Sequence, residues 1–117
     1  MSFGLQMERH RRALIVRLAG ELDHHASDEV RTRIDEAIVR GDVTYLILSL
    51  KDLTFMDSSG IGVILGRYKH ITGKGGKMVV CDVTKPVQRL FEMSGLFKIV
   101  SIEPSEHEAL SSLGVVS

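Results

Sequence analysis

The sequence predicts an α/β fold with a mostly parallel sheet and an N-terminal antiparallel hairpin, in the order β-β-α-β-α-β-α-β-α. Two observations predict this fold. Short apolar runs with strand character alternate with stretches in which apolar residues recur at helical spacing. The first two runs are separated only by the polar turn His10-Arg11-Arg12, which is typical of a hairpin. A chain of 117 residues has room for one such domain, 1–117, and one core.

The hairpin and the first helix come from the N-terminal third of the chain. Residues 4–9 and 13–19 alternate in the manner of strands, and the polar loop 20–25 follows them. A helix capped by Ser27 or a neighbour then runs to about Arg40, before Gly41. Its expected apolar face consists of Val30, Ile34, Ala37 and Ile38.

The centre of the chain changes period at Asp57-Ser58-Ser59-Gly60. Before it, Tyr45–Leu50 has the apolar character of a buried parallel strand. After it, a helix is predicted up to the turn Gly73–Gly76. Its expected apolar face consists of Ile61, Ile64, Leu65, Tyr68 and Ile71. Short polar residues suit a helix start because they can accept hydrogen bonds from its free N–H groups.

The remaining elements are shorter. Residues 78–81 form a strand, and Thr84-Lys85-Pro86 opens a helix that Gly95 ends. Residues 99–102 form the last strand, and Ser105 with Glu108 starts the last helix as a capping box. The expected apolar side of the 84–95 helix consists of Val87, Leu90, Phe91 and Met93. Met56, Met78 and Met93 are taken as core residues.

Charge and composition exclude several classes of protein. Lys plus Arg and Asp plus Glu both number 15, so the formal net charge is zero and no basic region for nucleic acid is evident. No apolar run is long enough to span a bilayer. Cys81 is the single cysteine, which leaves no internal disulfide, and its strand position indicates a buried, inert thiol. We therefore expect a soluble, cytoplasmic protein without nucleic-acid or membrane partners.

Three loops should meet at one edge of the sheet. Connections that leave the carboxyl ends of parallel strands share an edge, which applies to residues 20–25, 54–60 and 82–85. This placement groups the side chains Glu21, Asp23, Asp57 and Ser58. The Gly73–Gly76 turn should lie at the opposite edge, and its glycine spacing fits no phosphate-binding loop.

Ser58 and Ser59 admit three interpretations. One of them can be a simple N-cap, one can accept a phosphate, or one can be a nucleophile served by His24 or His25. The Gly-x-Ser-x-Gly elbow of many hydrolases is absent. Asp23, His24 and His25 could instead bind a metal, although adjacent loop residues rarely converge on one ion.

The helix after Gly60 also contains Gly62 and Gly66, and each glycine inside a helix costs about 1 kcal/mol relative to alanine. Close packing on the sheet or close approach of another molecule must offset this cost. Arg67 on the same helix is expected either on its solvated face or at the rim of a docking site.

Three stretches resemble a known family. Residues 55–69, Phe-Met-Asp-Ser-Ser-Gly-Ile-Gly-Val-Ile-Leu-Gly-Arg-Tyr-Lys, resemble the phosphorylation motif of the STAS domain family. Within that family, residues 20–25 and 87–99 are similar to the anti-sigma factor antagonists of the sporulation sigma F system in endospore-forming bacilli. The resemblance covers essentially the whole chain.

The resemblance implies a regulator rather than an enzyme, with no cofactor of its own. Its unphosphorylated form would bind an anti-sigma factor that is also a serine kinase, carrying ATP or ADP, and so release the sigma factor. The kinase would phosphorylate Ser58, a PP2C-type phosphatase would reverse this, and the chain alone would be a monomer. The expected partner-binding residues are Glu21, Asp23, Ser58, Ser59, Gly60, Gly62 and Arg67.

Three alternatives stay open. The first is a small nucleotide-binding or hydrolytic enzyme that uses Ser58 and His24. The second is the general-stress antagonist of the same family, against which the paired histidines 24 and 25 argue. The third is a STAS module that senses a ligand or regulates a membrane transporter.

Overall fold

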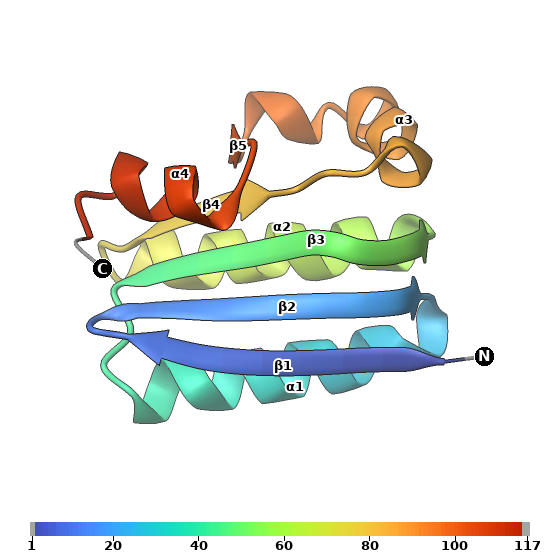
Figure 1. The fold of residues 1–117 in the computed structure, drawn as a ribbon. Coiled ribbons are helices and arrows are strands. Elements are labelled where there is room, and N and C mark those ends of the chain that lie inside the picture. The colour runs from blue at the N-terminus through green and yellow to red at the C-terminus, as the bar shows by residue number, and fades with distance from the viewer. Residues whose placement is uncertain (1, 116–117) are drawn as a thin grey trace.

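The computed structural model describes residues 2–115 as a five-stranded sheet with helices on both faces (Figure 1). Residues 1, 116 and 117 of the expected 1–117 domain lie outside the described residues. The strands lie in the order β1-β2-β3-β4-β5, with β1 antiparallel to β2 and all other neighbours parallel. The predicted fold class and element order are therefore confirmed.

The bounds of the elements differ from the predicted ones mainly at the ends of strands. The elements are β1 (Phe3–His10), β2 (Ala13–Leu22), α1 (His24–Arg40), β3 (Tyr45–Met56), α2 (Ser58–Gly73), β4 (Lys77–Cys81), α3 (Lys85–Ser94), η1 (Leu96–Lys98), β5 (Ser101–Glu103) and α4 (Glu106–Ser112). The last strand thus starts two residues later than predicted, because a short 3-10 helix precedes it. Among the helices of residues 2–115, none combines the length and apolarity needed to cross a bilayer.

The predicted loops 20–25 and 54–60 begin as strand and end as helix. β2 continues to Leu22 and pairs with β3 as far as Met56. Register shifts in β2 on both sides of Gly20 make this possible. Gly20 has a φ of 84°, and a Cβ there would collide with the backbone oxygen of Ser2. With such an irregularity a strand can continue through polar residues. The alternation of apolar and polar residues in the sequence therefore does not reveal the full length of β2.

The main core lies between the sheet and the helices α1 and α2, which cover one face of the sheet (Figure 1). Successive strand residues point to opposite faces. Leu46 and Leu48 of β3 therefore face this core, whereas Ile47 packs with the residues under α4. Of the predicted apolar face of α1, Val30, Ile34 and Ile38 are fully buried and Ala37 is partly buried.

The prediction that Met93 belongs to the core is wrong. Met56 and Met78 are buried, but Met93 on α3 is 74% exposed. α3 buries Val87 and Phe91. Met93 follows Phe91 by two residues, which places it on the far side of a helix that packs on one side only.

The second face of the sheet holds α4 through one charged contact and a small apolar cluster. Arg17 of β2 donates to both carboxylate oxygens of Glu106, at 2.7 and 2.8 Å, and also to Glu8 at 2.9 Å. These bonds from Arg17 hold the pKa of Glu106 below its usual range. Cys81 is fully buried in the cluster, where burial raises its thiol pKa to about 12, so the predicted inert thiol is confirmed.

Candidate functional site

Two aspartates start the two helices at the carboxyl edge of the sheet. Asp23 follows β2 and accepts a hydrogen bond from the Ala26 N–H at 2.9 Å, and so caps α1. Asp57 follows β3 and accepts from the Ser59 N–H at 2.9 Å, and so caps α2. The expected cap at Ser27 or a neighbour is therefore wrong, and the interpretation of Ser58 or Ser59 as a simple N-cap does not hold.

The two helix starts lie side by side, as the grouping of loops at this edge predicts. The Asp57 N–H donates to the backbone oxygen of Leu22 at 3.4 Å, which ties the end of β2 to the start of α2. Ser27 of α1 and Ser59 of α2 also meet, with their hydroxyl oxygens 2.9 Å apart. The positive ends of both helices therefore act on one small region of the surface.

Ser58 is the first residue of α2, and its side chain is exposed. Within residues 2–115 its hydroxyl makes no hydrogen bond. Asp57 already accepts from the free N–H groups of the helix start, so the Ser58 hydroxyl has no capping role. It is thus a free hydroxyl at the positive end of a helix, where a negative group is favoured.

Ser59 is in a different environment. It is partly buried, and its hydroxyl donates to Asp57 Oδ1 while lying against the hydroxyl of Ser27. Sequence position does not separate two adjacent serines, but their surroundings in the structure do.

Asp57 is held in its ionised form by both helices. The Ser59 hydroxyl is the largest influence that lowers the Asp57 pKa, and the backbone N–H groups of Ser59, Gly60 and His24 add to it against the opposing effect of burial. His24 is the first residue of α1, so N–H groups at the starts of both helices lower the pKa of this carboxylate.

We predict that Asp57→Asn lowers the stability of the domain by its full amount above about pH 4 and by progressively less as the pH falls further. A carboxyl whose folded pKa is lowered stabilises the fold above its unfolded pKa, about 3.9, and this contribution disappears as the pH falls through the folded pKa. Asparagine still caps the helix, so the loss in unfolding free energy at pH 7 should be about 0.5–1 kcal/mol. Urea denaturation at pH 7 and pH 3 measures it. A loss of equal size at both pH values would contradict the prediction.

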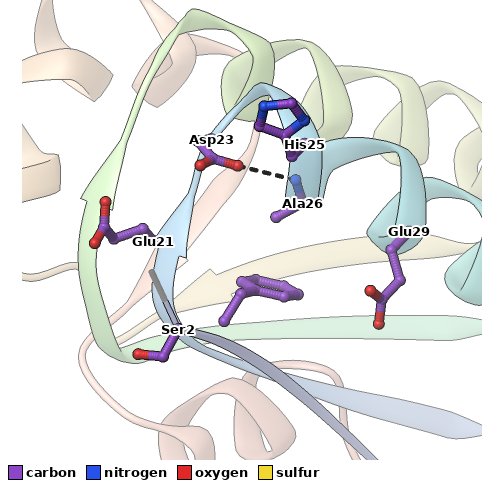
Figure 2. A pocket seen from close by; sticks show the side chains of 7 residues that line it. Ser2, Glu21, Asp23, His25, Ala26 and Glu29 are labelled. Atoms are coloured by element: carbon purple, nitrogen blue, oxygen red, sulfur yellow. Dashed lines mark hydrogen bonds between the residues drawn. The ribbon is translucent and has the colours of Figure 1, made fainter.

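An acidic pocket of about 460 Å³ lies beside the helix starts, between the beginning of β1 and the first turns of α1 (Figure 2). Its lining residues are Ser2, Phe3, Glu21, Asp23, His25, Ala26 and Glu29. In Figure 2, Asp23 points to the N–H of Ala26, while Glu21 and Glu29 lie on opposite sides of the hollow. Three carboxylates thus give this part of the edge a negative charge.

Gly60 and Gly62 differ in what surrounds them. A Cβ on Gly60 would lie 2.5 Å from Met56 Cγ and 3.1 Å from Leu22 Cδ2, so this glycine is needed for packing. Gly60 is buried, and its expected contact with a partner stays a prediction. Gly62 is exposed, with nothing within 4 Å of an added Cβ, and so leaves an open stretch on α2.

Arg67 also lies elsewhere than expected. It is only 7% exposed and does not belong to the solvated face of α2, and its expected contact with a partner stays a prediction. Its Nε lies 2.9 Å from Asp35 Oδ1 of α1, and the same oxygen meets His70 Nδ1 at 2.9 Å. Burial lowers the Arg67 pKa, which the charge of Asp35 opposes. Within residues 2–115, neither Nε nor Nη1 makes a well-aligned hydrogen bond.

We predict that Asp35→Asn lowers the unfolding free energy by about 1–2 kcal/mol. The substitution leaves the buried Arg67 guanidinium without its counter-charge, and the partial exposure of Asp35 reduces the cost below that of a fully buried pair. Chemical denaturation measures the loss. The double variant Asp35→Asn with Arg67→Met is the control, and it should recover most of the loss because the uncompensated charge is gone. No recovery would mean that Asp35 acts mainly through His70.

One surface residue was not identified from the sequence. Phe55 is 45% exposed at the end of β3, directly opposite Glu21 of β2. Aromatic side chains are enriched at protein interfaces relative to the rest of the surface. Burial in the folded chain distinguishes Phe55 from Leu53 and Met56, which are both buried, and alternation along the strand does not predict this.

The paired histidines lie at the start of α1. His24 and His25 are exposed, and their rings meet edge to face with centroids 5.8 Å apart. Among the described side chains, neither imidazole donates to or accepts from Ser58. Across residues 2–115, no three His, Cys, Asp or Glu side chains gather in the manner of a metal site.

Known proteins match both the sequence and the fold. The sequence model of the STAS domain matches residues 4–109. The anti-sigma F factor antagonist of Paenibacillus polymyxa is 62% identical over the full length of both chains. The solved structure of the anti-sigma factor antagonist SpoIIAA in its unphosphorylated form has a TM-score of 0.76 and 32% identity, covering 97% of this chain and 100% of that one. The Bacillus cell fate determinant SpoIIAA in the phosphorylated form has a TM-score of 0.75 and 35% identity, covering 93% and 98%.

Proposed function

Because the chain belongs to the STAS domain family, we propose that it acts as an anti-sigma factor antagonist that a phosphate on Ser58 switches off. The observation that carries the proposal is the free Ser58 hydroxyl, exposed at the start of α2 beside a negatively charged edge. The full-length relative named as an anti-sigma F factor antagonist supports the sporulation branch over the general-stress branch.

The proposed partner is an anti-sigma factor with serine kinase activity, which carries the ATP or ADP. The unphosphorylated chain binds it and frees sigma F, and a PP2C-type phosphatase restores this form after phosphorylation. All of these steps take place in the cytoplasm. Support for a phosphorylated state comes from the similar SpoIIAA fold, which has been solved in a phosphorylated form.

The proposed contact surface is the exposed part of the carboxyl edge. It combines the free hydroxyl of Ser58, the open backbone at Gly62, the aromatic ring of Phe55 and the carboxylates of Glu21 and Asp23. An aromatic anchor within a charged surround fits a protein partner with a positively charged face. Ser59 supports this surface indirectly, since it is partly buried and its hydroxyl positions Asp57.

The physical effect of a phosphate differs between the fold and the partner. A phosphate adds roughly 1.5–2 negative charges at neutral pH. The start of α2 tolerates such a charge because the helix dipole favours it. A docked partner, by contrast, meets a bulky, hydrated anion next to existing carboxylates. The modification can therefore abolish binding while the domain stays folded.

Mapping of the added phosphate tests the proposal. The purified chain is incubated with ATP and a candidate anti-sigma kinase, and the added mass is located by peptide mass spectrometry. We expect one phosphate on Ser58 and none in Ser58→Ala, which should fold and bind the kinase normally. Nucleotide turnover by the chain alone, without phosphate on Ser58, would instead support the enzyme alternative that uses His24.

A further inference from the structure

Ser27 connects the start of α1 to the serine that follows Ser58. Its side chain is only 7% exposed, and its Oγ lies 2.9 Å from Ser59 Oγ and 2.8 Å from the backbone oxygen of Asp23. Ser59 Oγ in turn donates to Asp57 Oδ1. The hydroxyl of Ser59 is thus enclosed by groups from both helices.

Counting protons gives this chain of contacts a direction. Each hydroxyl has one proton, while a carboxylate and a backbone carbonyl can only accept. Three contacts therefore share two protons. The Asp23 carbonyl already accepts from the Ser27 N–H at 3.0 Å, so the Ser27 proton can serve Ser59 without leaving that carbonyl unpaired. The Ser27 hydroxyl thus has two acceptors, the Asp23 carbonyl at 2.8 Å and Ser59 Oγ at 2.9 Å. When it donates to Ser59, the chain of hydrogen bonds runs from Ser27 to Ser59 to Asp57.

We infer that Ser27 is a positioning residue for the switch, because its hydroxyl helps to lock Ser59 and leaves Ser58 as the phosphate acceptor. The inference rests on the proposed function. It extends that function by assigning the choice between two adjacent serines to a residue of another helix.

The chemistry of phosphoryl transfer explains the choice. The acceptor oxygen must approach the γ-phosphate of ATP, its proton passes to a base, the new O–P bond forms and ADP leaves with the bridging oxygen. At Ser59 the proton is engaged by Asp57 and the oxygen by Ser27. At Ser58 neither is engaged within the described residues. A bond to a charged group favours the locked form roughly tenfold to hundredfold.

Phosphorylation of four proteins tests the inference: the wild type, Ser58→Ala, Ser58→Ala with Ser27→Ala, and Ser58→Ala with Ser27→Thr. We expect phosphate on Ser58 alone in the wild type and none in Ser58→Ala. Loss of the Ser27 hydroxyl in the first double variant removes a neutral hydrogen bond and should make phosphorylation of Ser59 about twofold to tenfold faster than in Ser58→Ala. Threonine keeps a hydroxyl and should suppress it again. Circular dichroism and kinase binding confirm that each variant is folded.

Two results would overturn the inference while leaving the proposed function intact. One is rapid phosphorylation of Ser59 in the single variant Ser58→Ala, which would show that Ser59 is not locked. The other is a folded, kinase-binding Ser58→Ala/Ser27→Ala variant without phosphate on Ser59, which would show that Ser27 does not control the choice.

A second measurement separates failure of the inference from failure of the proposed function. If a competent kinase leaves even the wild type unmodified, the proposed function is wrong, and the role of Ser27 in phosphorylation is wrong with it. The hydroxyl chain can still be tested by proton NMR without a kinase. A slowly exchanging Ser59 hydroxyl proton in the wild type, lost in Ser27→Ala and retained in Ser27→Thr, supports the lock. Rapid exchange in the wild type contradicts it.

Discussion

Leucine at Gly60 is expected to destabilise the domain by at least about 3 kcal/mol, whereas leucine at Gly62 leaves it folded and impairs partner binding. The reason is the space around each residue. An added Cβ at Gly60 meets Met56 and Leu22, and the rest of a leucine side chain has no room. At Gly62 the side chain extends into open space, where it would block the approach of a partner.

Substitution by alanine also distinguishes the two glycines, because it should change the unfolding free energy in opposite directions at Gly60 and Gly62. Gly62→Ala should raise the unfolding free energy by about 0.5–1 kcal/mol, since alanine favours a helix and nothing opposes its methyl group. Gly60→Ala should lower it by about 1–3 kcal/mol. Thermal and urea denaturation measure both changes.

Gly66 provides the control for binding. It lies one turn beyond Gly62 on α2, and an added Cβ there would also meet nothing within 4 Å. Gly66→Leu tests whether any bulky residue on this helix affects the partner or only one close to Ser58. If Gly62→Leu binds the anti-sigma partner as well as the wild type does, the open stretch of α2 does not belong to the contact surface.

Aspartate at Ser58 is expected to weaken the complex with the anti-sigma partner at least about thirtyfold, or about 2 kcal/mol. The added carboxylate must lose its hydration when the partner docks, and it would be repelled by a partner carboxylate that faces position 58, so it opposes docking. At the first position of α2 the same carboxylate is favoured by the helix dipole. The unfolding free energy should therefore stay within about 0.5 kcal/mol of the wild type or rise slightly.

Asparagine at Ser58 is the matched control, because it has nearly the same shape as aspartate without the charge. Isothermal titration should show that Ser58→Asn keeps most of the affinity. The difference between the two variants should shrink as salt is added. Equal affinities of wild type and Ser58→Asp would contradict a switch that acts through charge, and equal losses in both variants would assign the effect to bulk.

The fold could be predicted because its signals are local. The change of apolar period at Asp57 located the junction between a buried strand and a helix, and the carboxyl-edge rule brought Asp23 and Asp57 together. The full length of β2 and β3 could not be predicted in this way. It depends on an irregularity at Gly20, which appears only when two distant strands pair.

The candidate site was predicted less completely, for reasons that individual residues show. Arg67 was assigned by its charge, although it lies three residues after Ile64 and four before Ile71, both fully buried, and its counter-charge Asp35 comes from another helix. Gly60 and Gly62 have the same sequence signal, and only their neighbours distinguish them. Tertiary contacts, or the lack of them, decide all three cases, and a single sequence does not contain them.

The double attachment of Asp57 bears on how quickly the protein can change state. Its carboxylate accepts a hydrogen bond from the Ser59 N–H of α2, and its backbone N–H donates to Leu22 at the end of β2. The residues around Ser58 are therefore already ordered before any modification. Segments that must order or open add steps of microseconds to seconds. We expect no such step here, so enzyme turnover and partner dissociation alone set the rate of switching.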